Sequence, residues 1–353
     1  MSEYLRAWVP ACLPTAPAVC RIDEISAGVW EVETEAGVLV VAKHQVFADD
    51  FYHAANDLLQ VEERLLDLLG TADCSVPRIL GVDPETRFIF FEHKGRHTAD
   101  DLCQTASSSV RNELGRALTR EFCHIEVALS DHAADVNPLI SPTGSREYLA
   151  RKDVQALRGA EKGLQWLAGG QTKTHRKQCE LLHALTDKIY VRPPTLGSMD
   201  YNARNVVVDG DTGKPCFIEF AKIGWDRPER RLVQYSTGLG AGKAKGRFVS
   251  LMTSETAQFY AAALPEDAKG RLLALDGHHL HFHLNAFAML LGALESSDKS
   301  ANRALLAVWR QPQLRQRQLV EAITATLSDD PLCAELRSSI AALEGNPFAG
   351  ENR

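Results

Sequence analysis

One stretch of the chain, from Gly197 to Arg231, constrains the fold more than any other. Two apolar runs within it, Val206–Val208 and Cys216–Phe220, flank a segment at residues 209–213 that reads Asp-Gly-Asp-Thr-Gly. Apolar runs separated by such turn residues are typical of a β-hairpin. We therefore predict a β-hairpin here, and the rest of the fold has to accommodate it.

Three side chains that carry oxygen donors converge at one end of this hairpin. Asp200 precedes the first strand, Asn205 opens it, and Glu219 ends the second. Phosphoryl transfer uses such a set, because a carboxylate orients the attacking hydroxyl and hard oxygen ligands hold Mg²⁺ on the nucleotide phosphates. Each residue alone has a plainer interpretation, as a turn cap, a strand-edge residue and a solvated carboxylate. Their convergence favours Asp200 as the catalytic residue and Asn205 and Glu219 as metal ligands.

The composition excludes several other classes of function. The chain has 353 residues, of which 45% are hydrophobic, so it can bury a large core. Its net charge of −7 argues against nucleic acid as a partner, since duplex binding needs a strongly basic face. No apolar run approaches the roughly 18 to 20 residues of a membrane helix, and the N-terminus lacks a signal-peptide layout. We therefore expect a cytoplasmic protein without a membrane partner.

The eight cysteines are scattered along the chain and include no Cys-x-x-Cys pair. This spacing suggests neither a zinc module nor a thioredoxin-type site. Reduced thiols in a cytosolic protein are the expectation.

The first quarter of the chain predicts a small sheet. Three runs rich in Val and Ile, at residues 19–25, 29–34 and 38–43, indicate an antiparallel meander. A helix at 48–70 follows, with leucines at helical spacing, and then two strands around a turn, at 75–81 and 87–92.

The remainder predicts helices, so the order of elements indicates an α+β architecture. The expected helices lie at 108–130, 146–168, 172–190, 248–263, 266–275, 278–296, 301–310, 314–327 and 332–343, with a loop over 131–150. His279 and His283 lie four apart on one helical face, but a polar helix face is favoured over a metal site because no nearby Glu completes a zincin motif. The glycine-rich segment 236–243 fails both phosphate-loop templates and is expected to be a loop.

The chain resembles the aminoglycoside phosphotransferase and choline kinase-like superfamily, the small-molecule relatives of protein kinases. The resemblance covers about residues 19 to 300, but its specific motifs are few. Asp200 and Asn205 keep the family's spacing of five, the run 218–220 stands where Ile-Asp-Phe is expected, and Lys43 ends a strand similar to Val-Ala-Ile-Lys.

The resemblance implies a two-lobed, protein-kinase-like fold. Residues 1–93 would form an N-terminal nucleotide-binding lobe with an antiparallel sheet, and residues 94–353 a mainly helical C-terminal lobe with the catalytic loop and the acceptor site. ATP or GTP, together with Mg²⁺, would bind between the lobes. The reaction would be transfer of a phosphoryl group to a hydroxyl of a small molecule that is aminoglycoside-, sugar-, nucleoside- or amino-alcohol-like.

The resemblance also implies roles for residues of the N-terminal lobe. Lys43 would bind the α- and β-phosphates, held by a carboxylate for which we choose Glu62, with Glu63 as the alternative. The turn from Ser26 to Gly28 would cover the phosphates with backbone N–H groups, although its single glycine, taken alone, favours a plain hairpin turn.

The segment that leads out of the last strand of the sheet would bind the base. The backbone around Phe91 to His93 would hydrogen-bond the edge of adenine, and Phe90 would lie beside the ring. His93 itself is expected to be a surface side chain.

Three departures from the family's pattern leave the activity open. Ser198 and Met199 replace the His and Gly ahead of the catalytic Asp, Glu219 replaces a metal-binding Asp, and Arg231 stands before Leu232 where an Asp usually braces the catalytic loop. These departures motivate a second hypothesis, a nucleotide-binding pseudokinase with a structural or regulatory role. Nucleotidyl transfer on the same fold is a third.

Overall fold

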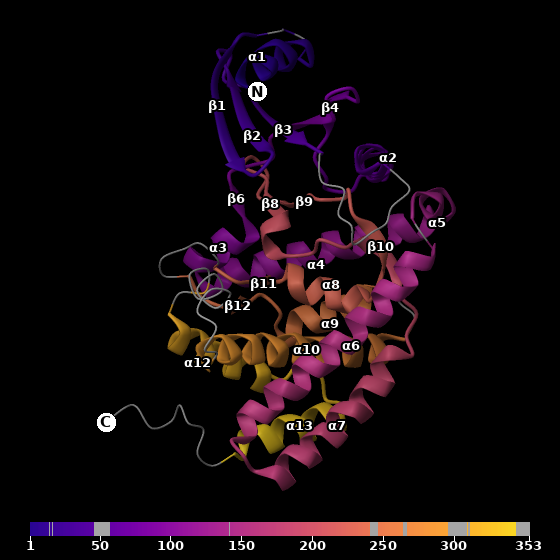
Figure 1. The fold of residues 1–353 in the computed structure, drawn as a ribbon, viewed down its shortest axis with the longest axis vertical. Helices are drawn as coiled ribbons and strands as arrows, with labels where there is room; N and C mark the ends of the chain where they lie inside the picture. Colours follow the sequence, from indigo (N-terminus) through magenta and orange to yellow (C-terminus); the bar gives the residue numbers. More distant parts are fainter. Residues whose placement is uncertain are drawn as a thin grey trace.

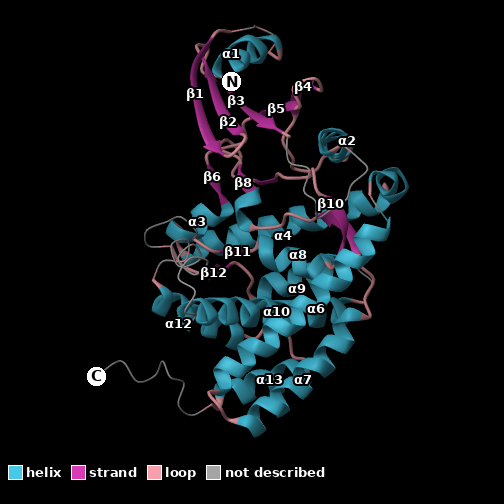
Figure 2. Cartoon of the chain, viewed as in Figure 1, coloured by secondary structure: helices cyan, strands magenta, loops and turns pink. Residues whose placement is uncertain are grey.

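The computed structural model describes residues 1–343 except 14, 16, 46–56, 141, 241–245, 264–266, 296–308 and 310. Within them the chain forms a two-lobed α+β fold, with a sheet at one end and helices over the rest (Figures 1 and 2). The predicted fold class is therefore confirmed. None of the described helices combines the length and the apolar character of a bilayer-crossing segment.

The N-lobe is built on one antiparallel sheet whose strands run in the order β1-β2-β3-β5-β4. Its strands are β1 (Val19–Ser26), β2 (Val29–Thr34), β3 (Leu39–His44), β4 (Ile79–Asp83) and β5 (Phe88–Glu92). The meander predicted from the Val- and Ile-rich runs is confirmed, because β1, β2 and β3 pair as successive antiparallel neighbours.

Two helices accompany the sheet. Helix α1 (Ser2–Ala11) lies before the first predicted strand, where the sequence predicted no helix or strand. Its Leu5 and Val9 pack against Val40 and Phe88. Helix α2 (Leu58–Thr71) belongs to the large core below the sheet. It begins at Leu58, where the Asp57 side chain accepts a hydrogen bond from the Leu59 N–H at 3.0 Å and so caps the helix. Most of the part predicted before Leu58 lies outside the described residues.

The C-lobe is mainly helical. Its helices are α3 (Ala99–Thr105), α4 (Ser108–Asp131), α5 (Ala133–Val136), α6 (Pro142–Ala168), α7 (Thr172–Tyr190), α8 (Pro228–Tyr235), α9 (Ser254–Ala263), α10 (Ala268–Glu295), α12 (Pro312–Thr324) and α13 (Pro331–Ala341), with 3₁₀ turns η1 (Asn137–Leu139) and η2 (Ala203–Asn205). Short strands join them: β6 (His97–Thr98), β7 (Thr195–Ser198), β8 (Val206–Val208), β9 (Pro215–Phe217), β10 (Ile223–Asp226), β11 (Thr237–Gly238) and β12 (Val249–Ser250).

The hairpin on which the sequence prediction centred is present as β8 and β9. Val206 pairs with Phe217 in an antiparallel register, and β6 adds a third strand on the other side of β8. A separate ribbon of β7 and β10 precedes and follows the hairpin. The stretch that the sequence singled out therefore runs through four strands in two separate sheets, and β8 and β9 lie above α4 (Figure 1).

Two helix boundaries differ from the prediction. The loop expected over 131–150 is wrong, because α5, η1 and the start of α6 occupy it; Pro142 opens α6, a position where proline is well accommodated. The helices expected at 266–275 and 278–296 are one helix, α10, which passes through Gly277. The helix expected at 301–310 lies almost wholly outside the described residues.

Candidate active site

A cavity of about 1050 Å³ lies between the two lobes. Its lining combines Lys43 and Glu62 of the N-lobe with Asp200, Asn205 and Glu219 of the C-lobe. Ser26, Phe91 and His93 line it as well. Gly28 does not, although its φ of 75° shows that it forms the turn after β1 in the conformation that glycine adopts easily. The structure thus brings all but one of the predicted site residues to one cavity.

Lys43 is positioned by the alternation of β3. Its neighbour Ala42 faces the core under α1, so Lys43 faces the cavity. Its Nζ lies 2.8 and 3.0 Å from the two carboxylate oxygens of Glu62, a side chain on α2 that is only 1% exposed. Burial alone would lower the pKa of Lys43, but the carboxylates of Glu62 and Glu219 outweigh it and raise this pKa. The lysine is therefore a positive charge that Glu62 fixes on the N-lobe side of the cavity.

Glu219 approaches the same lysine from the opposite lobe. Its Oε2 lies 2.9 Å from Lys43 Nζ, and its backbone has a φ of 70°, in the left-handed region that costs a non-glycine residue roughly 1 kcal/mol. The prediction that Glu219 ends a strand is not met, since β9 ends at Phe217. The left-handed turn after β9 is what brings the carboxylate to the cavity.

Hydrogen bonds fix the loop that carries Asp200. Ser198 Oγ donates to the Glu219 carbonyl at 2.7 Å and accepts from the Asp200 N–H at 3.3 Å. Asn205 Nδ2 donates to the Asp200 carbonyl at 2.6 Å, and Asn202 Nδ2 to the Asp200 carboxylate at 3.2 Å. Ser198, which stands where the resembling family has His, thus connects the loop to the turn at Glu219.

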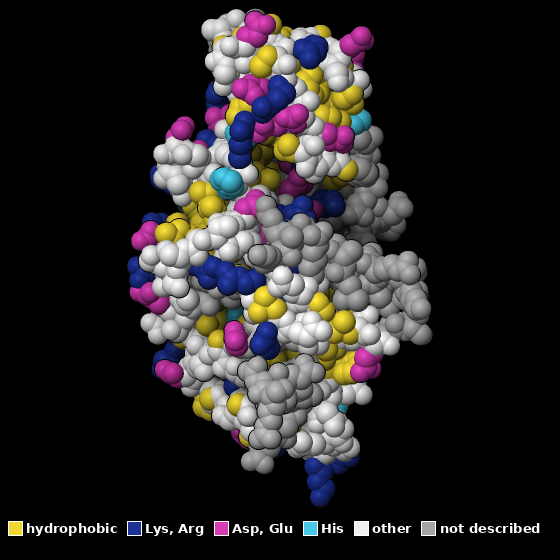
Figure 3. Space-filling view, turned by 90° about the vertical axis from the view of Figure 1, so that its left-hand side faces the viewer, with side chains coloured by type: hydrophobic (Ala, Val, Ile, Leu, Met, Phe, Trp, Pro, Cys, Tyr) yellow, Lys and Arg dark blue, Asp and Glu magenta, His cyan; other side chains and the backbone are white. Residues whose placement is uncertain are grey.

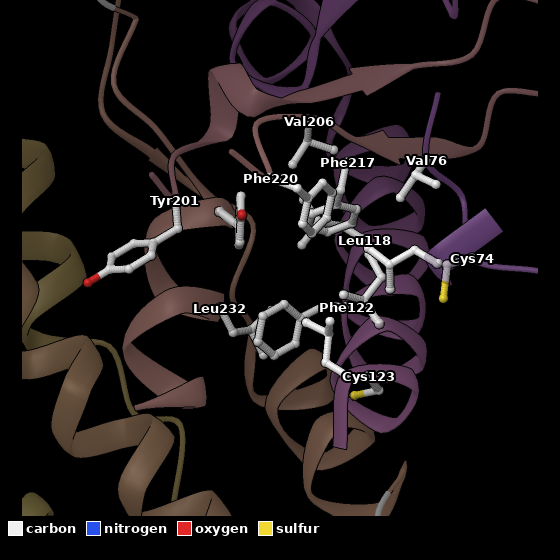
Figure 4. Packing of buried hydrophobic residues seen from close by; sticks show 14 of the residues in the cluster. Cys74, Val76, Leu118, Phe122, Cys123, Tyr201, Val206, Phe217, Phe220 and Leu232 are labelled. Atoms are coloured by element: carbon white, nitrogen blue, oxygen red, sulfur yellow. The ribbon is translucent and has the colours of Figure 1, made fainter. Parts of the chain in front are cut away.

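The hydrophobic floor of the site is the hairpin itself. Figure 4 shows Val206, Phe217 and Phe220 pointing toward Leu118 and Phe122 of α4, with which they form one buried cluster. Because these side chains are at most 2% exposed, the hairpin is anchored below while its polar residues face the cavity above.

The expectation that Phe90 lies beside the base is wrong. Phe90 faces α1 and stacks on Trp8, with ring centroids 5.2 Å apart, whereas Phe91 faces the cavity. Successive side chains of a strand point to opposite faces, and the prediction assigned the wrong face to Phe90.

His93 is not the surface side chain that we expected. Its Nε2 lies 2.9 Å from the Oε2 of Glu31, and both side chains are 11% exposed. Arg21 and Arg96 also contact Glu31, at 3.0 and 3.4 Å. This cluster lines the cavity from the N-lobe side. Figure 3 shows charged side chains of both signs on the N-lobe, above the junction between the two lobes.

Buried charges that the sequence prediction missed lie below the stretch that carries Asp200. Arg231, 1% exposed, makes two 2.7 Å hydrogen bonds to the carboxylate of Glu126 and also contacts the backbone of Leu196. Asp226 is fully buried and accepts hydrogen bonds from Arg230 at 2.6 Å and from the Tyr201 hydroxyl. Arg231 thus connects β7 to α4.

The residues assigned to Mg²⁺ fit it in donor type. Asn205 uses its Nδ2 toward Asp200, which leaves its amide oxygen as a ligand, and the Glu219 side chain is 26% exposed to the cavity. Amide and carboxylate oxygens are the hard donors that Mg²⁺ prefers.

The histidine pair considered from the sequence lies elsewhere. His279 and His283 are buried in α10 with ring centroids 4.1 Å apart. Among the described residues, no third Cys, His, Asp or Glu completes a metal-binding group with them. Of the glycine-rich segment 236–243, residues 241–243 lie outside the described part of the chain.

No family model and no curated protein sequence matches this chain. Among solved structures, it is similar to an ethanolamine kinase of Plasmodium vivax, at 10% identity and a TM-score of 0.45 over 88% of this chain and 90% of that one. It is also similar to an aminoglycoside phosphotransferase of Alicyclobacillus acidocaldarius, at 12% identity and a TM-score of 0.47 over 94% and 97%. A choline kinase of Streptococcus pneumoniae gives 10% and 0.43 over 92% and 98%.

These solved structures come from the superfamily that the sequence resembles. At such identities and TM-scores, any activity of this chain has to be argued from the residues of its own site.

Proposed function

We propose that this protein is an ATP- or GTP-dependent O-phosphotransferase that acts on a hydroxyl of a small molecule. One observation carries the proposal: the Lys43 ammonium, held by buried Glu62, faces Asp200, Asn205 and Glu219 across a single cavity. A held cation, a carboxylate and hard oxygen donors around one cavity are the parts that phosphoryl transfer requires.

Each residue has a defined task in this proposal. Asp200 orients the acceptor hydroxyl and takes its proton, and the hydrogen bonds from Asn202 and Asn205 keep its carboxylate and backbone in place. Lys43 neutralises phosphate charge, and Glu62 keeps its ammonium directed into the cavity. Asn205 and Glu219 would hold Mg²⁺, which when bound neutralises the phosphates.

The remaining predicted residues bind the nucleotide. Ser26 covers the phosphates from the β1–β2 turn, which Gly28 shapes through its positive φ, and the backbone from Phe91 to His93 hydrogen-bonds the edge of the base. We place the lobe boundary between residues 93 and 94, after β5 leaves the N-lobe sheet and before β6 pairs with β8. The acceptor is then an aminoglycoside-, sugar-, nucleoside- or amino-alcohol-like molecule that enters from the C-lobe side.

A second candidate, a nucleotide-binding pseudokinase, is favoured by one contact. Glu219 Oε2 is already paired with Lys43, so the residue assigned to the metal is engaged by the residue assigned to the phosphates. A site that kept this pair closed would have a structural or regulatory role without turnover.

Radiolabelled nucleotide separates the two candidates. Wild-type protein is incubated with γ-labelled ATP or GTP, Mg²⁺ and a panel of hydroxyl compounds of the four classes, beside Asp200→Asn and the exposed-site control Asp211→Asn. Phosphotransferase activity predicts label on one class of acceptor, lost in Asp200→Asn and kept in the control. Label that is equal in wild type and Asp200→Asn, or absent with every acceptor although nucleotide binds, would overturn the proposal.

A further inference from the structure

We propose that Cys74, Glu121 and His124 form a binding site for a transition-metal ion, with Zn²⁺ as the ion that their chemistry favours. One ligand atom from each side chain, the thiol sulfur, a carboxylate oxygen and a ring nitrogen, lies within 4.8 Å of the other two. All three residues lie outside the lining of the cavity between the lobes. The site is therefore separate from the proposed phosphotransferase site and does not depend on it.

Two rigid segments supply the ligands. Glu121 and His124 lie three residues apart on α4, so both side chains project from one face of the helix. The same Glu-x-x-His spacing supplies metal ligands inside helical bundles. Cys74 comes from the turn between α2 and β4, where its N–H donates to the Leu69 carbonyl at 2.9 Å. Figure 4 shows Cys74 beside α4.

The ligand set distinguishes among metals. A thiolate and an imidazole suit Zn²⁺, whereas Mg²⁺ and Ca²⁺ are bound through oxygen. Cys74 forms no disulfide with any described residue, so its sulfur is available, and it would give its proton to solvent as the metal–sulfur bond forms. Three protein ligands leave a fourth tetrahedral position for water, on the side where His124 is exposed.

A neighbouring hydrogen bond already orients one ligand. The Ser75 N–H donates to Glu121 Oε1 at 2.6 Å, the kind of contact that fixes a metal-binding carboxylate. Glu121 and His124 make only a loose contact with each other, with 3.7 Å between the carboxylate oxygen and Nδ1. The carboxylate is thus held in place by a group other than the histidine.

The position gives the metal a role in joining the lobes. The Ser75 carbonyl accepts a hydrogen bond from the Phe217 N–H at 2.9 Å, so the segment 74–75 contacts both α4 and the strand that leads to Glu219. The same segment follows α2, which carries Glu62. A metal at Cys74, Glu121 and His124 would cross-link the end of α2 to α4. Because it binds only the folded arrangement, it would raise the melting temperature.

Cobalt substitution tests the site directly. Chelator-treated protein is titrated with Co²⁺, because tetrahedral Co²⁺ bound to a thiolate absorbs in the near ultraviolet and the visible. We expect one thiolate-bound Co²⁺ per chain, displaced by Zn²⁺. The variants are Cys74→Ser and His124→Ala, with Cys123→Ser as the control for a buried cysteine of α4 and His132→Ala for an exposed histidine.

The expected pattern is specific to the two ligands that are changed. The thiolate band disappears in Cys74→Ser, Co²⁺ affinity falls by more than about tenfold in His124→Ala, and both controls behave as wild type. A Zn²⁺-dependent rise in melting temperature follows the same pattern. His124 is exposed, so its variant folds whether or not Cys74→Ser does. Absence of a thiolate band in wild type, or an unchanged affinity in His124→Ala, would overturn the proposal.

Discussion

Lys43 and Glu219 form an ion pair of 2.9 Å although 176 residues separate them in the sequence. The pair joins β3 of the N-lobe to the turn after β9 of the C-lobe. In the proposed reaction each member has a ligand of its own, the phosphates for Lys43 and Mg²⁺ for Glu219. Nucleotide binding would therefore replace this pair with contacts to the ligand.

Glu62→Gln should impair the site, because a neutral amide no longer holds the Lys43 charge. We expect kcat/KM for the nucleotide to fall about 100-fold, the lower end of the loss found when one donor that stabilises transition-state charge is removed. Glu63→Gln is the matched control, since Glu63 is the neighbouring residue that does not contact Lys43. Steady-state kinetics on both variants checks this, and equal losses would contradict the assignment of Glu62.

Ser198→Ala should lower turnover more than stability alone explains. The variant removes the hydroxyl that joins the Glu219 carbonyl to the Asp200 N–H. We expect roughly 1 kcal/mol of lost stability and a fall in kcat. Ser236→Ala removes another buried hydroxyl, one that bonds only within its own helix region, and should cost similar stability with kcat unchanged. A kcat that fell equally in both variants would indicate a purely structural role for Ser198.

Arg231→Met should be among the most destabilising substitutions in the C-lobe. It leaves the carboxylate of Glu126 buried without its partner, which costs about 3 to 5 kcal/mol. Adding Glu126→Gln should recover part of this loss, since the uncompensated charge is then removed. Urea unfolding measures both, with Lys177→Met in the exposed Lys177–Glu335 pair as a control expected to change stability by less than about 0.5 kcal/mol.

Stability should fall in acid because α10 buries histidines in the neutral form. Burial lowers the pKa of His281 to about 3 and that of His283 to about 4. In the unfolded chain these side chains titrate near pH 6.5, so below that pH the unfolded state binds more protons. Each histidine then contributes a loss of roughly 1.4 kcal/mol per pH unit, until the pH reaches its folded-state pKa.

His283→Gln tests this directly. Between about pH 4 and 6, the slope of unfolding free energy against pH should decrease by the contribution of nearly one proton, roughly 1.4 kcal/mol per pH unit. His97→Gln, which changes an exposed histidine of β6, is the control for the loss of a histidine as such. An unchanged slope in His283→Gln would contradict the burial of a neutral histidine at this position.

Short-range sequence patterns predicted several helices and strands correctly. Alternation and turn residues identified the β8–β9 hairpin and the N-lobe meander, and helical spacing identified α4 and α7. The same patterns failed where one residue type is common in two kinds of structure. The loop was expected over residues 131–150, which contain Pro138 and Pro142, but proline is equally suited to the first turn of a helix, and α6 begins at Pro142.

The site was predictable only in part, for a related reason. Asp200, Asn205 and Glu219 lie within one stretch, and Lys43 belongs to a recognisable strand. Arg231 and Glu126, in contrast, are 105 residues apart, and an arginine beside a second arginine carries no signal that it is buried. The cluster of Cys74, Glu121 and His124 likewise forms only when α2 and α4 pack together.

The most direct test of the central claim is Mg²⁺-dependent nucleotide binding, measured as a shift in melting temperature. Wild type, Glu219→Gln and the control Asp209→Asn, in the hairpin turn outside the cavity, are melted with ATP or GTP, with and without Mg²⁺. A ligand that binds the folded state must raise the melting temperature. We predict a rise with one nucleotide that requires Mg²⁺, is lost in Glu219→Gln and persists in the control. No shift with either nucleotide, or an equal shift in Glu219→Gln, would contradict the account.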